Sequence, residues 1–228
     1  MRTLGIDTSS EVASVALLDD AVILAELSAR VSAQHGETLL PRIEELLALA
    51  KAARASIDLI AVGLGPGSFT GVRIGVATAK GLALGMGRPI VGLRTSEVIA
   101  AAVSGEHRVV AIDGKKGEVF ASVWRAEGDV LRCVLEDVHG APEVIAKRIR
   151  ALLDDAAISV VGTAVAAYPS FVDPLGAAVS VIDEPFPRAS VLAGRARSVF
   201  LARGPDDLAR LEPVYVRGAD ALLPAART

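Results

Sequence analysis

The sequence has little cysteine and few aromatic residues, and each shortage narrows what the protein can be. Its 228 residues include one cysteine, Cys133, so no disulfide can form within the chain. We expect this thiol to pack as a small apolar group in a reducing compartment. Aromatic residues make up 4% of the chain, whereas 52% of it is hydrophobic. The core must therefore be built mainly from alanine, valine, leucine and isoleucine.

Strong net charge and long apolar runs are also missing. The net charge of −3 gives no field that favours nucleic acid, so a basic surface would have to come from a partner. The nearest candidate for a membrane span, residues 74–86, is interrupted by Lys80 and is rich in glycine. The N-terminus enters a strand pattern at once and shows no signal peptide. The sequence therefore predicts a cytoplasmic protein without membrane contact.

The first hundred residues alternate between strand and helix patterns. Three strand patterns come first, and a clearly amphipathic helix follows them. The predicted strands are 3–7, 12–18, 22–30, 57–64 and 89–93, and the predicted helices are 37–51, 71–86 and 96–103.

A second cycle of the same kind begins near residue 107. The run Ile-Asp, a short polar turn, Glu-Val and Ala-Ser-Val starts at Ile6 and again, with a small insertion, at Ile112. Further strands are predicted at 130–138, 159–162 and 179–182, helices at 142–153 and 189–202, and a last strand or docked extension at 212–217.

These patterns predict an α/β protein made of two βββαβα-type halves, residues 1–104 and 105–228. The architecture that fits this description is the duplicated, ribonuclease H-like fold of actin, sugar kinases and the Hsp70 ATPase. In that fold the first hairpin of each half presents an aspartate to nucleotide phosphate and metal. Asp7 and Asp113 stand at these two places.

Asp7 with Thr8, and Asp113 with Lys115, are the candidate cofactor-binding residues. Asp7 could hold Mg²⁺ through water, and the alternative is an aspartate that caps its own turn with Thr8 and Ser9. Asp113 and Lys115 could form a residual anion site or a contact with a partner, and the alternative is a plain charged turn. The residue types leave both pairs of alternatives open.

Residues 62–87 are the most informative stretch of the chain. Gly65-Pro66-Gly67 predicts a tight turn after a strand, and Ser68 or Thr70 can cap the helix that follows. Each glycine inside a helix costs about 1 kcal/mol relative to alanine, so such a helix indicates that another backbone comes very close. That neighbour could be a nucleotide, the rest of this domain or a second polypeptide. Small residues form two stripes, one of Gly71, Gly75, Ala79 and Ala83 and one of Ala77, Gly81 and Gly85.

The two helices of the first half are the best candidates for a partner surface. The helix 37–51 has an apolar face broader than one sheet needs, and the helix 71–86 has small residues on two faces. The alternative is that these residues only pack on their own sheet. The residues predicted to contact a partner are Leu39, Leu40, Ile43, Leu46, Leu47, Gly71, Arg73, Gly75, Ala79 and Ala83.

Several enzyme classes find no support in the sequence. The 65–71 loop lacks the Gly-Lys-Ser/Thr ending of a Walker A motif, although a glycine turn before a helix can bind an anion through free N–H groups. The three histidines have no close ligand spacing, and no Gly-x-Ser-x-Gly elbow occurs. The second half offers a single glycine, Gly162, where adenosine sites of this fold usually have two. Zinc chemistry, serine hydrolysis and independent ATP hydrolysis are therefore all disfavoured.

The residues resemble one family in particular, that of TsaB, formerly YeaZ, and the matching motifs keep their order over nearly the whole chain. The most specific is the Gly-Pro-Gly-Ser-Phe-Thr-Gly block that begins at Gly65. At the second hairpin the family usually has arginine where this chain has Lys115 or Lys116, which keeps the charge but loses the planar fork. The motifs are Gly5-Ile6-Asp7-Thr8-Ser9, residues 34–41, residues 65–73, Asp113 with Glu118-Val119-Phe120, and Pro213-Val214-Tyr215-Val216-Arg217.

The resemblance implies an accessory subunit without catalytic residues or a cofactor of its own. Its catalytic relative TsaD has a His-x-x-x-His metal pair after a strand like 89–92, and the matching positions here are Thr95 and Ile99, neither of which can replace an imidazole. The implied partners are TsaD directly and TsaE in a ternary complex, with ATP and a metal used by those subunits. The chain alone is expected to form a homodimer when its partner is absent.

The implied reaction is threonylcarbamoyl transfer to N6 of adenosine 37 in tRNAs that read ANN codons, and tRNA would be met only through the complex. The alternative is a stand-alone ATP-dependent kinase or hydrolase, in which Asp7 and Asp113 would carry Mg²⁺.

Overall fold

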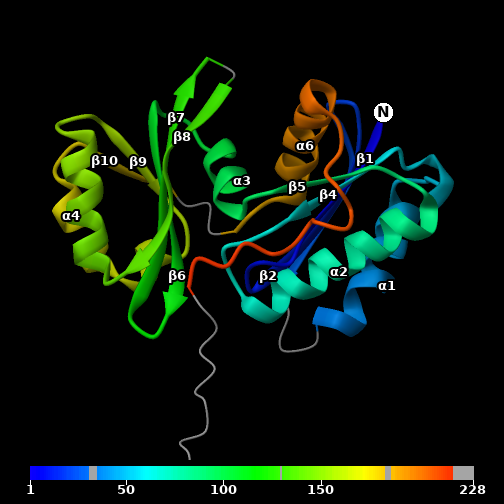
Figure 1. Cartoon of the computed structure of the whole chain (residues 1–228), viewed down its shortest axis with the longest axis horizontal. Coiled ribbons are helices and arrows are strands. Elements are labelled where there is room, and N and C mark those ends of the chain that lie inside the picture. The colour runs from blue at the N-terminus through cyan, green and yellow to red at the C-terminus, as the bar shows by residue number, and fades with distance from the viewer. Residues whose placement is uncertain (31–34, 129, 183–185, 218–228) are drawn as a thin grey trace, which may run out of the picture.

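The chain folds around two five-stranded sheets that lie side by side (Figure 1). This computed structural model describes residues 1–30, 35–128, 130–182 and 186–217, with the side chains of 35–37 left aside. The first sheet has the order β3-β2-β1-β4-β5 and the second the order β10-β9-β6-β7-β8. The strands are β1 (Arg2–Asp7), β2 (Val12–Asp19), β3 (Val22–Arg30), β4 (Leu59–Gly63), β5 (Ile90–Leu93), β6 (His107–Lys115), β7 (Glu118–Glu127), β8 (Val130–Gly140), β9 (Ile158–Val161) and β10 (Val179–Ile182).

The two sheets repeat one topology. In each, the first three strands form an antiparallel meander, and the next two strands add in parallel on the other side of the first strand. Each parallel addition requires a crossover, which a helix or short helical turns supply. The predicted α/β duplication is confirmed by this strand order.

The helices differ more between the halves than the strands do. In the first half α1 and α2 cover one face of the sheet, whereas in the second α4 is long and α5 has four residues. None of the described helices is long and apolar enough to cross a membrane. The helices are α1 (His35–Leu49), α2 (Phe69–Met86), α3 (Thr95–Ala101), α4 (Pro142–Leu153), α5 (Ala164–Ala167) and α6 (Ala189–Arg203).

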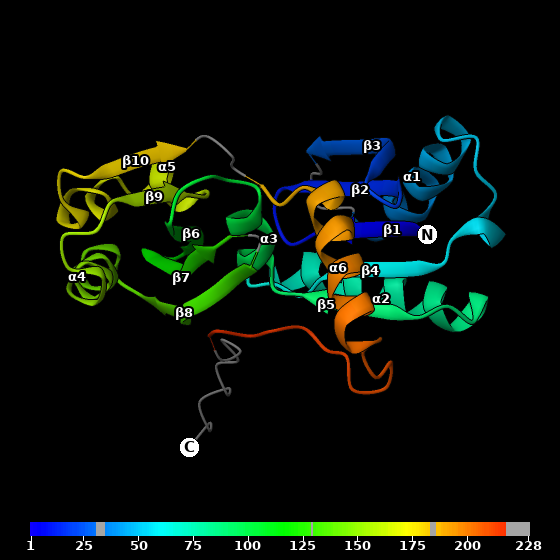
Figure 2. The same ribbon diagram turned by 90° about the horizontal axis from the view of Figure 1, so that it is seen from above.

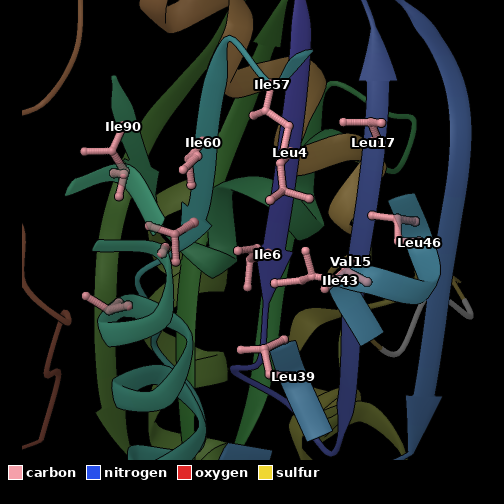
Figure 3. Packing of buried hydrophobic residues seen from close by; sticks show 14 of the residues in the cluster. Leu4, Ile6, Val15, Leu17, Leu39, Ile43, Leu46, Ile57, Ile60 and Ile90 are labelled. Carbon is pink, nitrogen blue, oxygen red and sulfur yellow. The ribbon is translucent and has the colours of Figure 1, made fainter. Parts of the chain in front are cut away.

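The largest core lies between the first sheet and helices α1 and α2. Figure 3 shows alternate residues of β1 and β2 meeting the inner side of α1. Leu39, Ile43 and Leu46 are fully or almost fully buried there because they recur every three to four residues on one side of the helix. This packing fixes the position of α1 and so determines which of its residues are exposed to solvent.

The last helix of each half packs on the opposite half. Leu192 and Ala196 of α6 lie in a buried cluster with residues of β4 and β5, while Ile99 and Ala100 of α3 pack with Val110 and Phe120 of the second sheet. Figure 2 shows α6 lying across the first sheet. The predicted boundary at 104/105 is therefore wrong for 189–214. The physical reason is that α1 and α2 leave the other apolar face of the first sheet bare.

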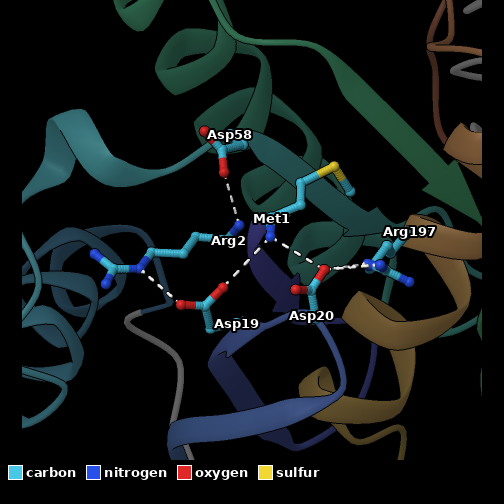
Figure 4. A network of polar contacts seen from close by, with 6 residues as sticks. All are labelled: Met1, Arg2, Asp19, Asp20, Asp58 and Arg197. Atoms are coloured by element: carbon cyan, nitrogen blue, oxygen red, sulfur yellow. Dashed lines mark hydrogen bonds and ion pairs between the residues drawn. The ribbon is translucent and has the colours of Figure 1, made fainter.

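A polar network at the N-terminus joins α6 to the first hairpin (Figure 4). The Met1 ammonium group lies 3.4 Å from Asp19 and 3.1 Å from Asp20, and Arg197 of α6 reaches Asp20 at 2.7 Å. The backbone N–H of Arg2 donates to Asp58 at 2.8 Å. Residues almost two hundred positions apart are thus held together at this corner.

Two further expectations need correction or completion. Cys133 is exposed, not packed as an apolar group, and it stands on β8, the edge strand of the second sheet. Of the two readings of 212–217, the docked extension is correct, since no strand forms there and the backbone N–H of Val214 donates to Leu64. Figures 1 and 2 show this segment running from α6 toward the second sheet.

Candidate functional site

A cleft of about 1140 Å³ lies between the two sheets. The turns after β1 and within the β6–β7 hairpin, the 66–69 loop and the docked C-terminal segment form its walls. Because both hairpin turns meet here, the duplication brings the two predicted cofactor sites to one place. The individual side chains decide what that place can bind.

Asp7 is sealed inside the first half. Its Oδ1 accepts hydrogen bonds from the Ser9 N–H at 2.8 Å and the Ser9 hydroxyl at 2.6 Å. Its Oδ2 lies against Gly63, so close that a Cβ there would stand 1.9 Å away, and it has no hydrogen-bond partner among the described residues. Burial raises the pKa of Asp7 to about 6, although the Ser9 donors act to lower it. The two Ser9 hydrogen bonds are those that the cap interpretation predicts, and Mg²⁺ binding by Asp7 stays a prediction.

Thr8 explains the first small-residue stripe of α2. Its hydroxyl donates to the Gly71 carbonyl at 2.7 Å. A Cβ at Gly71 would lie 2.0 Å from the Thr8 carbonyl oxygen, and one at Gly75 would lie 2.3 Å from the Thr8 hydroxyl. The close neighbour of this stripe is therefore the rest of the same domain. A nucleotide or a second polypeptide has no access to it.

Most of the residues predicted to contact a partner are instead buried within the chain itself. Gly71 and Gly75 are buried against Thr8, and the remaining small and apolar members are taken up by the core. The prediction is wrong for Leu39, Ile43, Leu46, Leu47, Gly71, Gly75, Ala79 and Ala83, which are all buried. Of the predicted set, Leu40 and Arg73 are exposed.

The second stripe of α2 faces outward. Ala77, Gly81 and Gly85 are exposed, and a Cβ at Gly81 or Gly85 would meet no described atom within 4 Å. Leu84 on the same helix is 73% exposed, and Leu49 at the end of α1 is 58% exposed. The outer side of these two helices therefore carries apolar and small residues that nothing in the described chain covers.

Asp113 and Lys115 form a charged turn on the cleft wall. Lys115 lies 2.8 Å from Asp113 through its ammonium group and donates its backbone N–H to the same carboxylate. The Tyr168 hydroxyl donates to Asp113 as well, at 2.9 Å. Although partial burial acts to raise it, these hydrogen bonds hold the pKa of Asp113 below its ordinary value. The charged-turn interpretation accounts for both residues without a ligand.

Three N–H groups of the 65–71 loop donate hydrogen bonds within the chain. The Ser68 N–H donates to Ser9, and the Gly71 N–H donates to the Ser68 hydroxyl, which caps α2. The Gly65 N–H is directed to Thr95. These contacts support the structural interpretation of the loop over a phosphate cradle. The described residues also contain no group of three or more His, Cys, Asp or Glu that could hold a metal ion.

One cluster was not predicted from the sequence. The Arg73 guanidinium lies over the Phe69 ring, 3.7 Å from its centroid, and its Nε donates to the Tyr215 hydroxyl at 2.7 Å. The Phe69 and Tyr215 rings are 5.4 Å apart. The only signal was that Phe69, Arg73 and Tyr215 all belong to motifs of the resemblance. Spacing could not join them, because Tyr215 arrives from the far end of the chain.

Comparison with known proteins places this geometry in a family. The family model described as TsaD, a tRNA N6-adenosine threonylcarbamoyltransferase, matches residues 28–181. The chain is 34% identical over 224 residues to the tRNA threonylcarbamoyladenosine biosynthesis protein TsaB of Escherichia coli K12, covering 95% of both chains. This chain belongs to the TsaB family. Membership links it to the biosynthesis of threonylcarbamoyladenosine in tRNA.

Solved structures agree with the TsaB assignment. YeaZ from Pseudomonas aeruginosa superposes with a TM-score of 0.82 at 27% identity, over 94% of this chain and 99% of that one. A polyphosphate/ATP-glucomannokinase from Arthrobacter superposes with a TM-score of 0.52 at 12% identity, over 89% and 99%, which shows the fold alone. The predicted actin and sugar-kinase type of fold is confirmed.

Proposed function

We propose that this chain is a non-catalytic accessory subunit that binds TsaD and holds it in the conformation that transfers threonylcarbamoyl to N6 of adenosine 37 in tRNAs reading ANN codons. A subunit that binds one conformation of its partner more tightly raises the population of that conformation. Family membership supports the pathway. The outward stripe of α2 is the observation that carries the binding role.

The outward stripe has a composition that its own subunit does not require. Gly81 and Gly85 stand in the middle and last turns of α2, where each glycine weakens the helix by about 1 kcal/mol relative to alanine. Gly71 and Gly75 are needed because Thr8 lies against them, but no described atom lies near a Cβ at Gly81 or Gly85. Glycine at these two places suits the close approach of a backbone from another subunit.

The side chains of α1 and α2 suit such a contact as well. Leu40 and Leu49 of α1 and Leu84 of α2 are at least half exposed. If the partner has the same fold, its two corresponding helices would pack against α1 and α2 in a pseudo-symmetric four-helix arrangement. The same face would form a homodimer when the partner is absent.

The position of the TsaD metal pair supports a role without catalysis. Thr95 and Ile99 stand there, and both are buried. The Thr95 hydroxyl accepts the Gly65 N–H, and Ile99 packs into the cluster beneath the second sheet. In the proposed complex, with TsaE as the third subunit, ATP and the metal belong to the partners, and tRNA is met only through the assembly.

The cleft favours one other function, a stand-alone ATP-dependent kinase or hydrolase. Its volume of about 1140 Å³ and the lysine on its wall suit a nucleotide. Isothermal titration of the pure chain with ATP and Mg²⁺ separates the two functions. Micromolar binding with turnover supports the enzyme, whereas binding that is weak or absent supports the accessory subunit.

The binding role is tested with Ala77→Leu and Gly81→Leu, which fill the outward stripe of α2 without touching the core. Ala151→Leu is the matched control, because Ala151 is exposed on α4 of the other half. Affinity for purified TsaD is measured by calorimetry, and tRNA modification by the reconstituted complex is measured beside it. We expect both to fall at least tenfold for the α2 variants and to stay unchanged for the control. Undiminished binding and modification would refute the proposed surface.

A further inference from the structure

We propose that Arg73 is the charged anchor of the outward face of α2 and binds a carboxylate of the partner subunit, with Phe69 and Tyr215 holding the guanidinium ready. This inference rests on the proposed function and specifies the chemistry of the partner at one point. Its evidence is the geometry and the charge around Arg73, which are independent of the small residues farther along the helix.

Arg73 is fixed on two sides and open on the third. Its guanidinium stacks on Phe69 at 3.7 Å, and its Nε donates to Tyr215 at 2.7 Å. The described residues supply no acceptor to its two terminal nitrogens, although the side chain is exposed. The terminal N–H groups of arginine form a planar fork that matches both oxygens of a carboxylate.

Arg73 has no acidic side chain beside it among the described residues. Two other exposed arginines do have one, since Arg54 pairs with Glu44 and Arg132 with Glu127. Among the described residues, none of the ion pairs includes Arg73. Two aromatic rings orient the guanidinium instead, so its terminal nitrogens remain available to an acid from outside.

The position of Arg73 joins it to the outward stripe. Phe69, Arg73, Ala77, Gly81 and Gly85 follow one another at intervals of four and are all exposed, so they form one stripe that winds around the exposed part of α2 by roughly 40° per step. A partner helix that packs along the small residues reaches Arg73 at the N-terminal end of the stripe. The contact would then have an apolar, small-residue centre and a charged group at its edge.

The surroundings of Arg73 suit a protein carboxylate better than a nucleic-acid phosphate. Binding to nucleic acid generally needs several cations along a groove, and the chain carries a net charge of −3. The next cation along α2, Lys80, is turned to the Leu211 carbonyl at 2.9 Å. On α2, Arg73 is thus a cation without a second one beside it on the exposed stripe, which suits one acidic side chain of a protein.

Tyr215 acts as a positioning residue. The docked segment that carries it is held to the first half by Val214, whose N–H donates to Leu64 at 2.8 Å, and to the second half by Arg217, which lies 3.1 Å from Glu118. The tyrosine hydroxyl therefore has a fixed place from which it orients Arg73. Losing rotamer freedom before binding reduces what association must supply.

The test uses the full-length chain and purified TsaD, with affinity measured by calorimetry at low and high salt. Arg73→Gln removes the charge, Arg73→Lys keeps the charge but removes the fork, and Tyr215→Phe removes only the hydroxyl. Arg132→Lys, on the second sheet, is the matched control. We expect affinity to fall at least thirtyfold for Arg73→Gln, about tenfold for Arg73→Lys and about threefold for Tyr215→Phe, and to hold for the control.

The outcomes separate this inference from the proposed function. If the unaltered chain binds TsaD and Arg73→Gln binds within twofold of it, the anchor is overturned while the accessory role stands. If Arg73→Gln leaves TsaD affinity intact but weakens tRNA binding by the assembled complex, a phosphate is the ligand and the carboxylate is overturned. If the unaltered chain does not bind TsaD at all, both proposals fail. Unchanged melting temperatures show that a loss of affinity is not a loss of folding.

Discussion

The Thr8 hydroxyl donates to the Gly71 carbonyl oxygen at 2.7 Å, and this one bond ties the turn after β1 to the first turn of α2. The two backbones are so close that the Thr8 carbonyl oxygen would stand 2.0 Å from a Cβ at position 71. The inward glycines of α2 thus serve the domain's own packing, whereas the outward ones have no such use in the described chain. These opposite environments on one helix can be measured.

Gly71→Ala and Gly75→Ala should each destabilise the chain. Alanine has the better helix propensity by about 1 kcal/mol, but the added methyl meets Thr8 at 2.0 Å and 2.3 Å, and neither group can move freely in this buried turn. Overpacking of this kind typically costs about 1–3 kcal/mol, so the clash should prevail. Urea unfolding measures the change.

Gly81→Ala and Gly85→Ala are the matched controls on the same helix. No described atom lies within 4 Å of either new methyl group, so the propensity gain should appear alone, as stabilisation of up to about 1 kcal/mol. Equal effects at all four glycines would contradict the two-faced description of α2.

Much of the fold could be predicted because hydrophobic periodicity depends on burial alone. The meanders, α1, α4 and the parallel strands all bury one face or both, and their patterns show it. The sequence could not show which stripe of α2 is buried and which faces outward, because Gly75 and Gly81 look alike in it. They differ in the fold because Thr8 lies against Gly75. The two interpretations of Asp7, metal ligand and turn cap, stayed open because no pattern tells whether a strand-end carboxylate points to the cleft or to Gly63.

The packing of α6 on the first sheet was also not predicted from the sequence. Leu192→Ala tests this corrected assignment of α6 to the first half. Leu192 is fully buried with Leu59 and Val91 of the first sheet. Removing its side chain should cost about 2–5 kcal/mol, as for other buried leucines. Leu152→Ala on α4, where the side chain is 48% exposed, is the control and should change stability by no more than about 0.5 kcal/mol. Similar losses for both would show that α6 does not cover the first sheet.

Cys133 should react as a free surface thiol in the native chain. It is exposed on the edge strand β8, so one equivalent should be titrated by a thiol reagent without denaturant. Partial burial and the nearby Glu136 and Asp137 raise the pKa of the thiol, so the reaction at pH 7 should be slower than that of free cysteine and should accelerate as the pH rises. If the thiol reacts only after unfolding, Cys133 is buried, as the sequence first predicted.

Asp7 should make the stability of the chain depend on pH in the opposite sense to a salt-bridged carboxylate. Burial raises its pKa from 3.8 to about 6, so the folded chain holds the proton more tightly than the unfolded chain does. The free energy of unfolding should therefore fall as the pH rises from about 4 through about 6, by roughly 3 kcal/mol for the two-unit shift. Asp7→Asn cannot titrate and serves as the reference. Both chains are unfolded in urea between pH 4 and pH 7. The difference between their free energies of unfolding should narrow or reverse over that range. Parallel curves would mean that the carboxylate is solvated, and the metal interpretation of Asp7 would then be favoured.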